Sequence, residues 1–398
     1  MDARKNPYAP GAGTPPPELA GRDAIIEKAS VALDRIRGGR AARSLVFYGL
    51  RGVGKTVLLN RIRLLAQEQA IVAVMIEAPE GRSLPSLLVP SIRAALLKIS
   101  RGEAMKAKAK DALRALGSFA TSLKIKYADI EIGLGLDNER GVADSGILEG
   151  DLTDLVLAVG EAAKESNTAV VLFIDELQYI AEEQMRALIS ALHRASQSQL
   201  PITMVGAGLP QLLGSMGAAK SYAERLFEFV SIGKLDSVAA TEALCKPAYR
   251  EGVDFSAGAI DEIIAQTQGY PYFLQEWGKH CWDIALKSPI DAETSQMATA
   301  SALDELDRSF FRVRFDRLTP TEKRYMRAMA ELGPGPHRSG DIADKLKKKV
   351  TTVAPMRNTL IAKGMIFSPA HGDTAFTVPL FDGFMRRIIP LLPDESSI

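Results

Sequence analysis

Residues 49–56 constrain the fold of this chain more than any other segment. They read Gly-Leu-Arg-Gly-Val-Gly-Lys-Thr, follow the apolar run 44–48, and precede a helical pattern that begins at Val57. A strand, a glycine-rich turn, Lys-Thr and a helix in this order are typical of a P-loop, which binds phosphate groups. The glycines let backbone N–H groups converge on phosphate oxygens, and the N-terminus of the helix adds a partial positive charge.

Two side chains of this loop have specific expected roles. We expect Lys55 to act on the β- and γ-phosphates of a nucleoside triphosphate, and the Thr56 hydroxyl to be a ligand of Mg²⁺. The simpler alternative is a glycine-rich turn that matches the spacing by chance. The residues of this segment predicted to bind the nucleotide are Gly49, Arg51, Gly52, Val53, Gly54, Lys55, Thr56 and Val57.

A second motif supports the first. Residues 170–176 read Val-Val-Leu-Phe-Ile-Asp-Glu, an apolar run typical of a central strand with both faces covered by helices. Carboxylates at the C-terminal end of such a strand lie where open α/β sheets bind their ligands. We predict that Asp175 holds the Mg²⁺, directly or through water, and that Glu176 orients or polarises the attacking water as a catalytic residue. The two motifs together predict a chain that binds a nucleoside triphosphate with Mg²⁺.

Composition excludes several other classes of protein. The 398 residues carry a net charge of +1, which argues against a globally basic nucleic-acid coat but permits a local basic patch. Cys245 and Cys281 lie far apart and form no CxxC pair, so neither a disulfide framework nor a zinc site is expected. The N-terminal residues lack an apolar leader, and no apolar run approaches the length of a membrane span. We therefore expect a soluble, cytoplasmic protein without a membrane partner.

The patterning divides the chain into four parts. Residues 1–17 are rich in Pro and Gly and predict an extended arm. Alternating helical and strand patterns over 18–235 predict a parallel sheet between helices, an α/β sandwich of the P-loop NTPase type. This part holds an irregular insert at about 101–147, with a basic, exposed helix at 105–116 and a half-exposed strand at 130–136. After residue 235 the strand signals stop, and the helical patterns of 236–316 predict a small helical lid.

Residues 317–398 are predicted to form a winged helix, because three short helical patterns at 321–332, 339–347 and 351–363 precede two short strands at 365–367 and 374–378. Residues 318–398 contain 12 Lys and Arg against 8 Asp and Glu, which leaves this part basic. If helix 351–363 enters a major groove of double-stranded DNA, lysines contact phosphates and other side chains contact base edges. The alternative is a solvated lysine face on a winged helix that binds a protein. The expected phosphate contacts are Lys347, Lys348 and Lys349, and the expected base contacts are Arg357 and Asn358.

With these motifs in place, the chain resembles the AAA+ ATPases of the origin-recognition-like group and their relatives among the archaeal-type and signal-transduction (STAND) ATPases. The resemblance rests on the P-loop, on Asp175-Glu176, and on three softer motifs, which are Gly21-Arg22-Asp23, Gly206-Ala207-Gly208-Leu209-Pro210 and Gly269-Tyr270-Pro271. It implies an α/β/α core, a helical lid, and ATP bound with Mg²⁺ in the cleft between them. It also implies activity that depends on assembly, such as a homo-oligomer, or on conformational switching.

The resemblance also assigns roles to residues outside the two motifs. Residues 17–22, and Arg22 among them, would lie against the adenine. Arg225 would be a catalytic arginine finger that acts on the nucleotide of a neighbouring subunit. The alternative for Arg225 is a solvated helix residue paired with Glu224 or Glu228.

Two departures from the family pattern predict slow or partner-stimulated hydrolysis. The fourth strand ends in Gly206-Ala207-Gly208 where relatives commonly carry a polar sensor residue. The helix after Gly269 carries Tyr272 and Gln275 where many relatives have a sensor arginine. Pro271, expected beside the nucleotide, is what the signal-transduction branch carries at its position. Two functions therefore stay open, an ATPase whose nucleotide state controls DNA binding, and a nucleotide-switched signalling or defence ATPase that acts on a protein partner.

Overall fold

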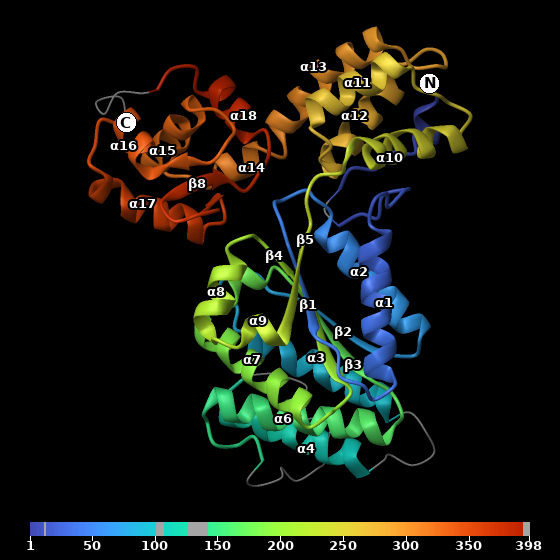
Figure 1. The fold of residues 1–398 in the computed structure, drawn as a ribbon, viewed down its shortest axis with the longest axis vertical. Coiled ribbons are helices and arrows are strands. Elements are labelled where there is room, and N and C mark those ends of the chain that lie inside the picture. Colours follow the sequence, from blue (N-terminus) through green and yellow to red (C-terminus); the bar gives the residue numbers. More distant parts are fainter. Residues whose placement is uncertain (12, 101–106, 126–141, 393–398) are drawn as a thin grey trace.

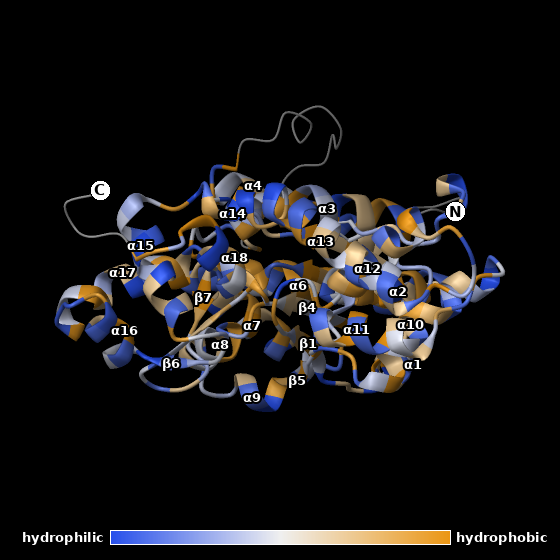
Figure 2. Cartoon of the chain, turned by 90° about the horizontal axis from the view of Figure 1, so that it is seen from above, coloured by the Kyte–Doolittle hydropathy of each residue, from blue (hydrophilic) through white to orange (hydrophobic). Residues whose placement is uncertain are grey.

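The computed structural model describes residues 1–11, 13–100, 107–125 and 142–392 (Figure 1). The strand expected at 130–136 lies outside the described residues, as do the first two residues of the helix expected at 105–116. Within the described part of the chain, no helix is long and apolar enough to cross a membrane. Figure 2 shows hydrophilic and hydrophobic residues interleaved along most helices, as in amphipathic helices that cover a core.

A five-stranded parallel sheet forms the centre of residues 18–235, here called the sheet region. The strand order is β2-β3-β4-β1-β5, so β4 separates the strand before the P-loop from the strand that ends in Asp175. Every residue of β3 and β4 is buried, which explains why their sequences are apolar except for Asp175 at the end of β3 and Thr203 in β4. The strands are β1 (Ser44–Tyr48), β2 (Val72–Glu77), β3 (Val170–Asp175), β4 (Ile202–Gly208) and β5 (Phe227–Ser231).

Helices cover both faces of this sheet (Figure 1). One face packs against α1 (Asp23–Arg37) and α2 (Lys55–Glu68) through a core that includes Leu33, Leu58 and Phe173. The other face packs against α3 (Leu84–Ile99), α6 (Leu148–Glu165) and α7 (Glu182–Gln197). This arrangement confirms the predicted α/β sandwich of the P-loop NTPase type. Two short helices not predicted from the sequence, α8 (Leu212–Ala219) and α9 (Ala223–Leu226), lie between β4 and β5.

Part of the predicted insert is an integral layer of the sheet region. Helix α4 (Ala107–Ser122) packs on α6 and α3, and it buries Leu113, Leu116 and Phe119 in the same core. Lys108 and Lys110 lie on its exposed side. The basic side is therefore exposed as expected, but the helix is not irregular surface structure, because its apolar side completes the core.

Residues 236–316 form a helical region whose buried residues share one hydrophobic core with those of the C-terminal region. Its helices are α10 (Ser237–Arg250), α11 (Ala257–Thr267), α12 (Pro271–Ile284) and α13 (Ala292–Arg308), followed by the short α14 (Arg312–Phe315). Asp236, Ser256 and Asp291 cap three of these helices by accepting backbone N–H groups, which explains where they begin. Tyr8 of the N-terminal segment is buried against this region and donates its hydroxyl hydrogen to the Leu244 carbonyl. The arm is therefore packed on the helical region.

The C-terminal region, residues 317–392, contains every element that was predicted there. Helix α15 (Pro320–Glu331) begins at a capping box of Thr319 and Glu322. It is followed by β6 (His337–Arg338), α16 (Ser339–Lys345), α17 (Val350–Ala362), β7 (Ile366–Phe367), β8 (Asp373–Phe376) and α18 (Phe381–Ile388). The strands form a small antiparallel sheet in the order β6-β8-β7. β6 and α18 are additions that the sequence did not predict, and α18 packs on α15.

The C-terminal region contacts the P-loop directly. The backbone N–H of Arg51 donates to the carbonyl of Thr377 at 2.9 Å. Arg317, just before α15, pairs with Glu80 of the sheet region at 2.7 Å. These contacts bring the C-terminal region to the edge of the sheet where β1 and β2 finish.

Candidate nucleotide site

The P-loop is built from a strand, a tight turn and a helix, as its sequence predicts. β1 ends at Tyr48, and α2 begins at Lys55 after Gly54, which has a left-handed backbone with φ of +89°. A Cβ at Gly49 would lie 2.0 Å from the carbonyl oxygen of Ile232, so only glycine allows this approach of the two chain segments. The first N–H groups of α2 are therefore left open towards the loop.

Lys55 bends back over the loop that precedes it. Its Nζ donates to the carbonyl of Gly49 at 3.0 Å and to that of Leu50 at 2.8 Å. Burial lowers the pKa of Lys55 to about 8, although the nearby carboxylates of Glu176 and Asp175 oppose this shift. An anionic ligand beside Lys55 would favour its charged form.

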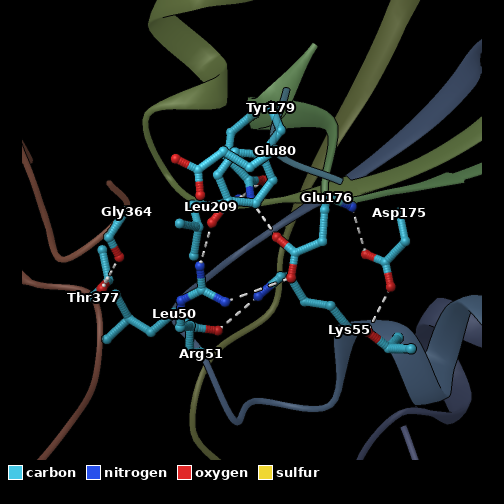
Figure 3. A network of polar contacts seen from close by, with 12 residues as sticks. Leu50, Arg51, Lys55, Glu80, Asp175, Glu176, Tyr179, Leu209, Gly364 and Thr377 are labelled. Atoms are coloured by element: carbon cyan, nitrogen blue, oxygen red, sulfur yellow. Dashed lines mark hydrogen bonds and ion pairs between the residues drawn. The ribbon is translucent and has the colours of Figure 1, made fainter. Parts of the chain in front are cut away.

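Thr56 and Asp175 meet although they belong to different motifs. The Thr56 hydroxyl donates to Oδ2 of Asp175 at 2.6 Å, and the backbone N–H of Glu176 donates to Oδ1 at 2.8 Å (Figure 3). Asp175 is buried, and this burial raises its pKa, while the two hydrogen bonds oppose the shift. The structure thus places one hydroxyl and one carboxylate together at the start of α2.

Glu176 is held on a turn with a left-handed backbone, φ of +55°. Nη1 of Arg51 lies 3.6 Å from its Oε1, and Nε2 of Gln178 donates to its Oε2 (Figure 3). Oε1 of Gln178 accepts the backbone N–H of Leu209 at 3.0 Å. Nη2 of Arg51 donates to the hydroxyl of Tyr179 at 2.9 Å. Gln178 and Tyr179 were not predicted, and their only signal in the sequence is that they lie two and three residues after Glu176.

A cavity of about 700 Å³ lies beside the P-loop, within the size range of ligand sites. The sheet region, the N-terminal segment, the helical region and α14 with its preceding turn all contribute walls. Of the residues predicted to bind nucleotide or metal, Gly49 does not line this cavity. Those that do are Arg22, Arg51, Gly52, Val53, Gly54, Lys55, Thr56, Val57, Asp175, Glu176 and Pro271.

Arg22 and Tyr272 each connect two walls of the cavity through a hydrogen bond. Nη2 of Arg22 donates to the carbonyl of Gly233 at 2.6 Å, and burial lowers the pKa of this guanidinium. The backbone N–H of Tyr272 donates to the carbonyl of Gly52 at 3.1 Å, so α12 begins in contact with the P-loop. Arg314 of α14 also lines the cavity and was missed, because nothing in its local sequence separates it from the other arginines of residues 308–317.

Arg225 lies outside this cavity. It is exposed on α9, and Glu228, one of the two acidic partners considered for it, pairs instead with Lys28 at 2.7 Å. Nothing in the described residues brings Arg225 to the nucleotide site of its own chain.

The side chains predicted to contact DNA differ in their exposure and in their hydrogen bonds within the chain. Lys347, Lys349 and Asn358 are exposed, and Lys348 is half-buried. Arg357 is engaged internally, because it donates to Thr374 Oγ1, Ser368 Oγ and the Asp373 carbonyl, each at 2.8 Å. These bonds, made by Nε and Nη2, fix α17 to the strand pair, and the base contact of Arg357 stays a prediction.

Comparison with known proteins supports this assignment of the fold. A family model described as an AAA ATPase domain matches residues 18–205, and one described as "Domain of unknown function (DUF8462)" matches residues 308–385. No curated protein matches the chain.

Several solved structures are similar to the chain. The Walker-type ATPase PABY2304 of Pyrococcus abyssi has 17% sequence identity and a TM-score of 0.58, over 94% of this chain and 97% of that one. The Aeropyrum pernix ORC1 protein in complex with DNA has 13% identity and a TM-score of 0.48, over 94% of each chain. The Thermotoga maritima RuvB Holliday junction branch migration motor has 16% identity and a TM-score of 0.44, over 90% and 92%. The matched family model assigns an AAA ATPase domain to residues 18–205, and the first of these structures agrees with the P-loop fold described above.

Proposed function

We propose that this chain binds Mg-ATP in the cavity beside the P-loop and hydrolyses it slowly. We further propose that the nucleotide state controls binding of a C-terminal winged helix to double-stranded DNA. The observation that carries the proposal is the hydrogen bond of the Thr56 hydroxyl to Oδ2 of Asp175, at 2.6 Å. Both residues, and Lys55 beside them, line a cavity that is large enough for a nucleotide.

The residues present fit Mg²⁺. Thr56 and Asp175 offer a hydroxyl and a carboxylate, which are the hard oxygen ligands that this ion prefers. Mg²⁺ in phosphate sites usually keeps water and phosphate ligands, so two protein ligands suffice. No group of three or more His, Cys, Asp or Glu in the described ranges offers a metal site elsewhere. When bound, the ion would neutralise negative charge on the phosphates, and Lys55 would hold them from the loop.

The arrangement around Glu176 supports slow turnover. A carboxylate that activates water must be free to accept a proton or a hydrogen bond from it. Here Nε2 of Gln178 donates to one oxygen of Glu176, and the Arg51 guanidinium forms an ion pair with the other at 3.6 Å. Hydrolysis would require this pair of contacts to loosen, so a partner that moves Arg51 would stimulate the ATPase.

The contact between the P-loop and the C-terminal region supports coupling to DNA. The Arg51 N–H bond to Thr377 connects the nucleotide site to residues that follow β8. In the proposed winged helix, Lys347, Lys349 and Asn358 at and along α17 are exposed and would face the DNA. Arg357 would position the wing, and its predicted contact with bases remains a proposal.

Two further roles carried over from the family resemblance remain proposals. Arg225 is exposed on α9, where it would be accessible to a neighbouring subunit in a homo-oligomer and would act as an arginine finger there. Arg22, with the segment before it, would lie near the base of the nucleotide, since Glu18, Leu19 and Ala20 also line the cavity.

The second candidate is a nucleotide switch that presents its C-terminal region to a protein partner. The restrained Glu176 favours it, because a switch needs stable binding more than fast turnover. Helix α12 also brings Pro271, Tyr272 and Gln275 to the cavity and no cation.

The test is ATP turnover by the full chain at low salt, with and without duplex DNA. Stimulation by DNA that fades as salt rises supports the DNA-coupled ATPase, because phosphate contacts release counterions. A variant with Lys347→Glu, Lys348→Glu and Lys349→Glu should lose this stimulation and keep its basal rate. Slow turnover that is indifferent to DNA supports the switch. Unchanged ATP affinity in Lys55→Ala would overturn both.

A further inference from the structure

Arg314 occupies an unusual place in the chain. It lies on α14, the single helical turn that connects the helical region with the C-terminal region, yet its side chain lines the cavity beside the P-loop. Ser309, Phe310 and Val313 of the same segment line the cavity with it. The link between two regions therefore forms one wall of the nucleotide site.

The guanidinium of Arg314 is held in place by neutral groups. It lies 4.0 Å from the centroid of the Phe310 ring, and its Nη1 donates to the Phe310 carbonyl. The Phe310 ring in turn stacks on Tyr272 with 4.7 Å between centroids. Since Tyr272 is anchored to Gly52, the position of Arg314 is fixed relative to the P-loop.

The charge of Arg314 has no carboxylate partner within 4.0 Å among the described residues. Its neighbours are paired: Arg308 with Asp304, Arg312 with Asp316, and Arg317 with Glu80. Burial, and then the nearby positive charge of Arg51, lower the pKa of Arg314 to about 10. A partly buried cation that another cation destabilises is unfavourable unless an anion joins it.

The position of Arg314 relative to Glu176 indicates which part of a nucleotide it would contact. Arg314 and Glu176 both line the cavity, and the charges of Arg51 and Glu176 both act on the pKa of Arg314, so Arg314 lies near the carboxylate that we propose activates water. In a triphosphate site that carboxylate marks the terminal phosphate. Of helix α12, Pro271, Tyr272 and Gln275 line the cavity, so this helix brings no cation there.

We infer that Arg314 binds the terminal phosphate of the nucleotide, and that α14 is the element through which the chain distinguishes a triphosphate from a diphosphate. This inference rests on the proposed function and names a binding residue of the same site. The bound phosphate would hold α14, and with it Arg317 and the start of α15. Loss of that phosphate would release Arg314 and loosen the connection to the C-terminal region.

The test compares the affinity of the full chain for ADP and for a non-hydrolysable ATP analogue, by calorimetry with Mg²⁺ present. Arg314→Gln should weaken the analogue about tenfold or more, the loss of a charge-assisted hydrogen bond, and change ADP affinity less than about twofold. Arg314→Lys should recover part of the loss, since it keeps the charge without the fork. Arg312→Gln is the matched control on the same helix, exposed and outside the cavity, and should leave both affinities unchanged.

Equal weakening of both nucleotides, or no weakening of either, would overturn the inference and leave Arg314 as a packing residue on Phe310. Arg314→Met keeps this packing without the charge, and it replaces Arg314→Gln if the latter fails to fold by thermal unfolding. A wild-type chain that binds neither nucleotide would contradict the proposed function itself, an outcome distinct from wild-type binding that Arg314→Gln does not alter.

Discussion

The guanidinium of Arg51 lies 3.6 Å from the carboxylate of Glu176, while the backbone N–H of Arg51 is bonded to Thr377 of the C-terminal region. One P-loop residue thus contacts both the proposed water-activating carboxylate (Figure 3) and the C-terminal region. A movement of the C-terminal region would shift the backbone of Arg51 and alter its hold on Glu176. Through Arg51, a movement of the C-terminal region would therefore affect the carboxylate at the nucleotide site.

Replacing Arg51 tests whether this hold slows hydrolysis. Arg51→Ala should raise basal ATP turnover about two- to fivefold, the factor for the 0.5–1 kcal/mol of a partly exposed ion pair. Steady-state phosphate release measures the effect. Arg61→Ala, exposed on α2, is the control and should leave the rate unchanged. A lower rate in Arg51→Ala would show that Arg51 serves the reaction instead of restraining it.

The role of Glu176 has a separate test. Glu176→Gln should retain Mg-ATP affinity and lower turnover about 10²-fold or more, since a general base contributes that much. Single-turnover hydrolysis and equilibrium binding, measured on the same preparation, separate the two effects. Turnover at the wild-type rate would remove Glu176 from the chemistry.

The metal site makes a prediction of its own. Chelating Mg²⁺ with EDTA should abolish turnover, and Asp175→Asn should raise the Mg²⁺ concentration needed for half-maximal turnover about tenfold or more, because a neutral amide is a poorer ligand for a hard cation. Thr56→Ser keeps the hydroxyl and is the matched control for Thr56→Val, which removes it. Turnover that persists in EDTA would contradict the assignment of Thr56 and Asp175.

Local patterns predicted the parts of the site that lie within single elements. The strand before residue 49, the glycine-rich turn, the helix from Lys55 and the buried strand ending in Asp175 all follow from short-range periodicity and turn chemistry. The proximity of Thr56 and Asp175 follows as well, because parallel strands bring their carboxyl ends to one edge of the sheet.

The features that the sequence did not predict depend mainly on packing between residues that are far apart in the chain. Arg314 reaches the cavity only because α13 and α14 return to the P-loop, and no local signal marks this return. Helix α4 was expected to be peripheral, since its lysines dominate the pattern, but its apolar side completes the core. β6 is only two residues long, too short for a recognisable period.

The hydrogen bonds of Glu322 at the start of α15 predict that its contribution to the free energy of unfolding depends on pH. Oε2 of Glu322 accepts the Thr319 N–H at 2.7 Å and the Lys363 ammonium at 2.8 Å. Burial would raise the pKa of Glu322, but these hydrogen bonds outweigh burial and lower it. Glu322→Gln should reduce the free energy of unfolding at pH 7 by about 1.5–3 kcal/mol, the range for hydrogen bonds to a charged group.

The lowered pKa fixes the sign of that dependence. The contribution of Glu322 is fully present above the ordinary glutamate pKa of about 4.3, and it is lost as the pH falls through the lowered folded-state value. Denaturant unfolding of the wild type and of Glu322→Gln should therefore converge in acid. Glu331→Gln, whose side chain is 43% exposed, should reduce the free energy of unfolding less. If the difference in the free energy of unfolding between the wild type and Glu322→Gln persists unchanged at pH values where Glu322 is protonated, the ionised carboxylate is not the cause of that difference.

Gly364 tests whether the C-terminal region restrains the P-loop. A Cβ there would lie 3.2 Å from Nη2 of Arg51 and 3.4 Å from the hydroxyl of Tyr179, on a backbone with φ of +65°. Gly364→Val should therefore push Arg51 away and raise basal turnover in the same direction as Arg51→Ala. Gly372→Val is the matched control, because its φ of +82° imposes similar strain while a Cβ there meets no atom within 4 Å. If both variants changed turnover equally, backbone strain would explain the effect, and contact with Arg51 would not.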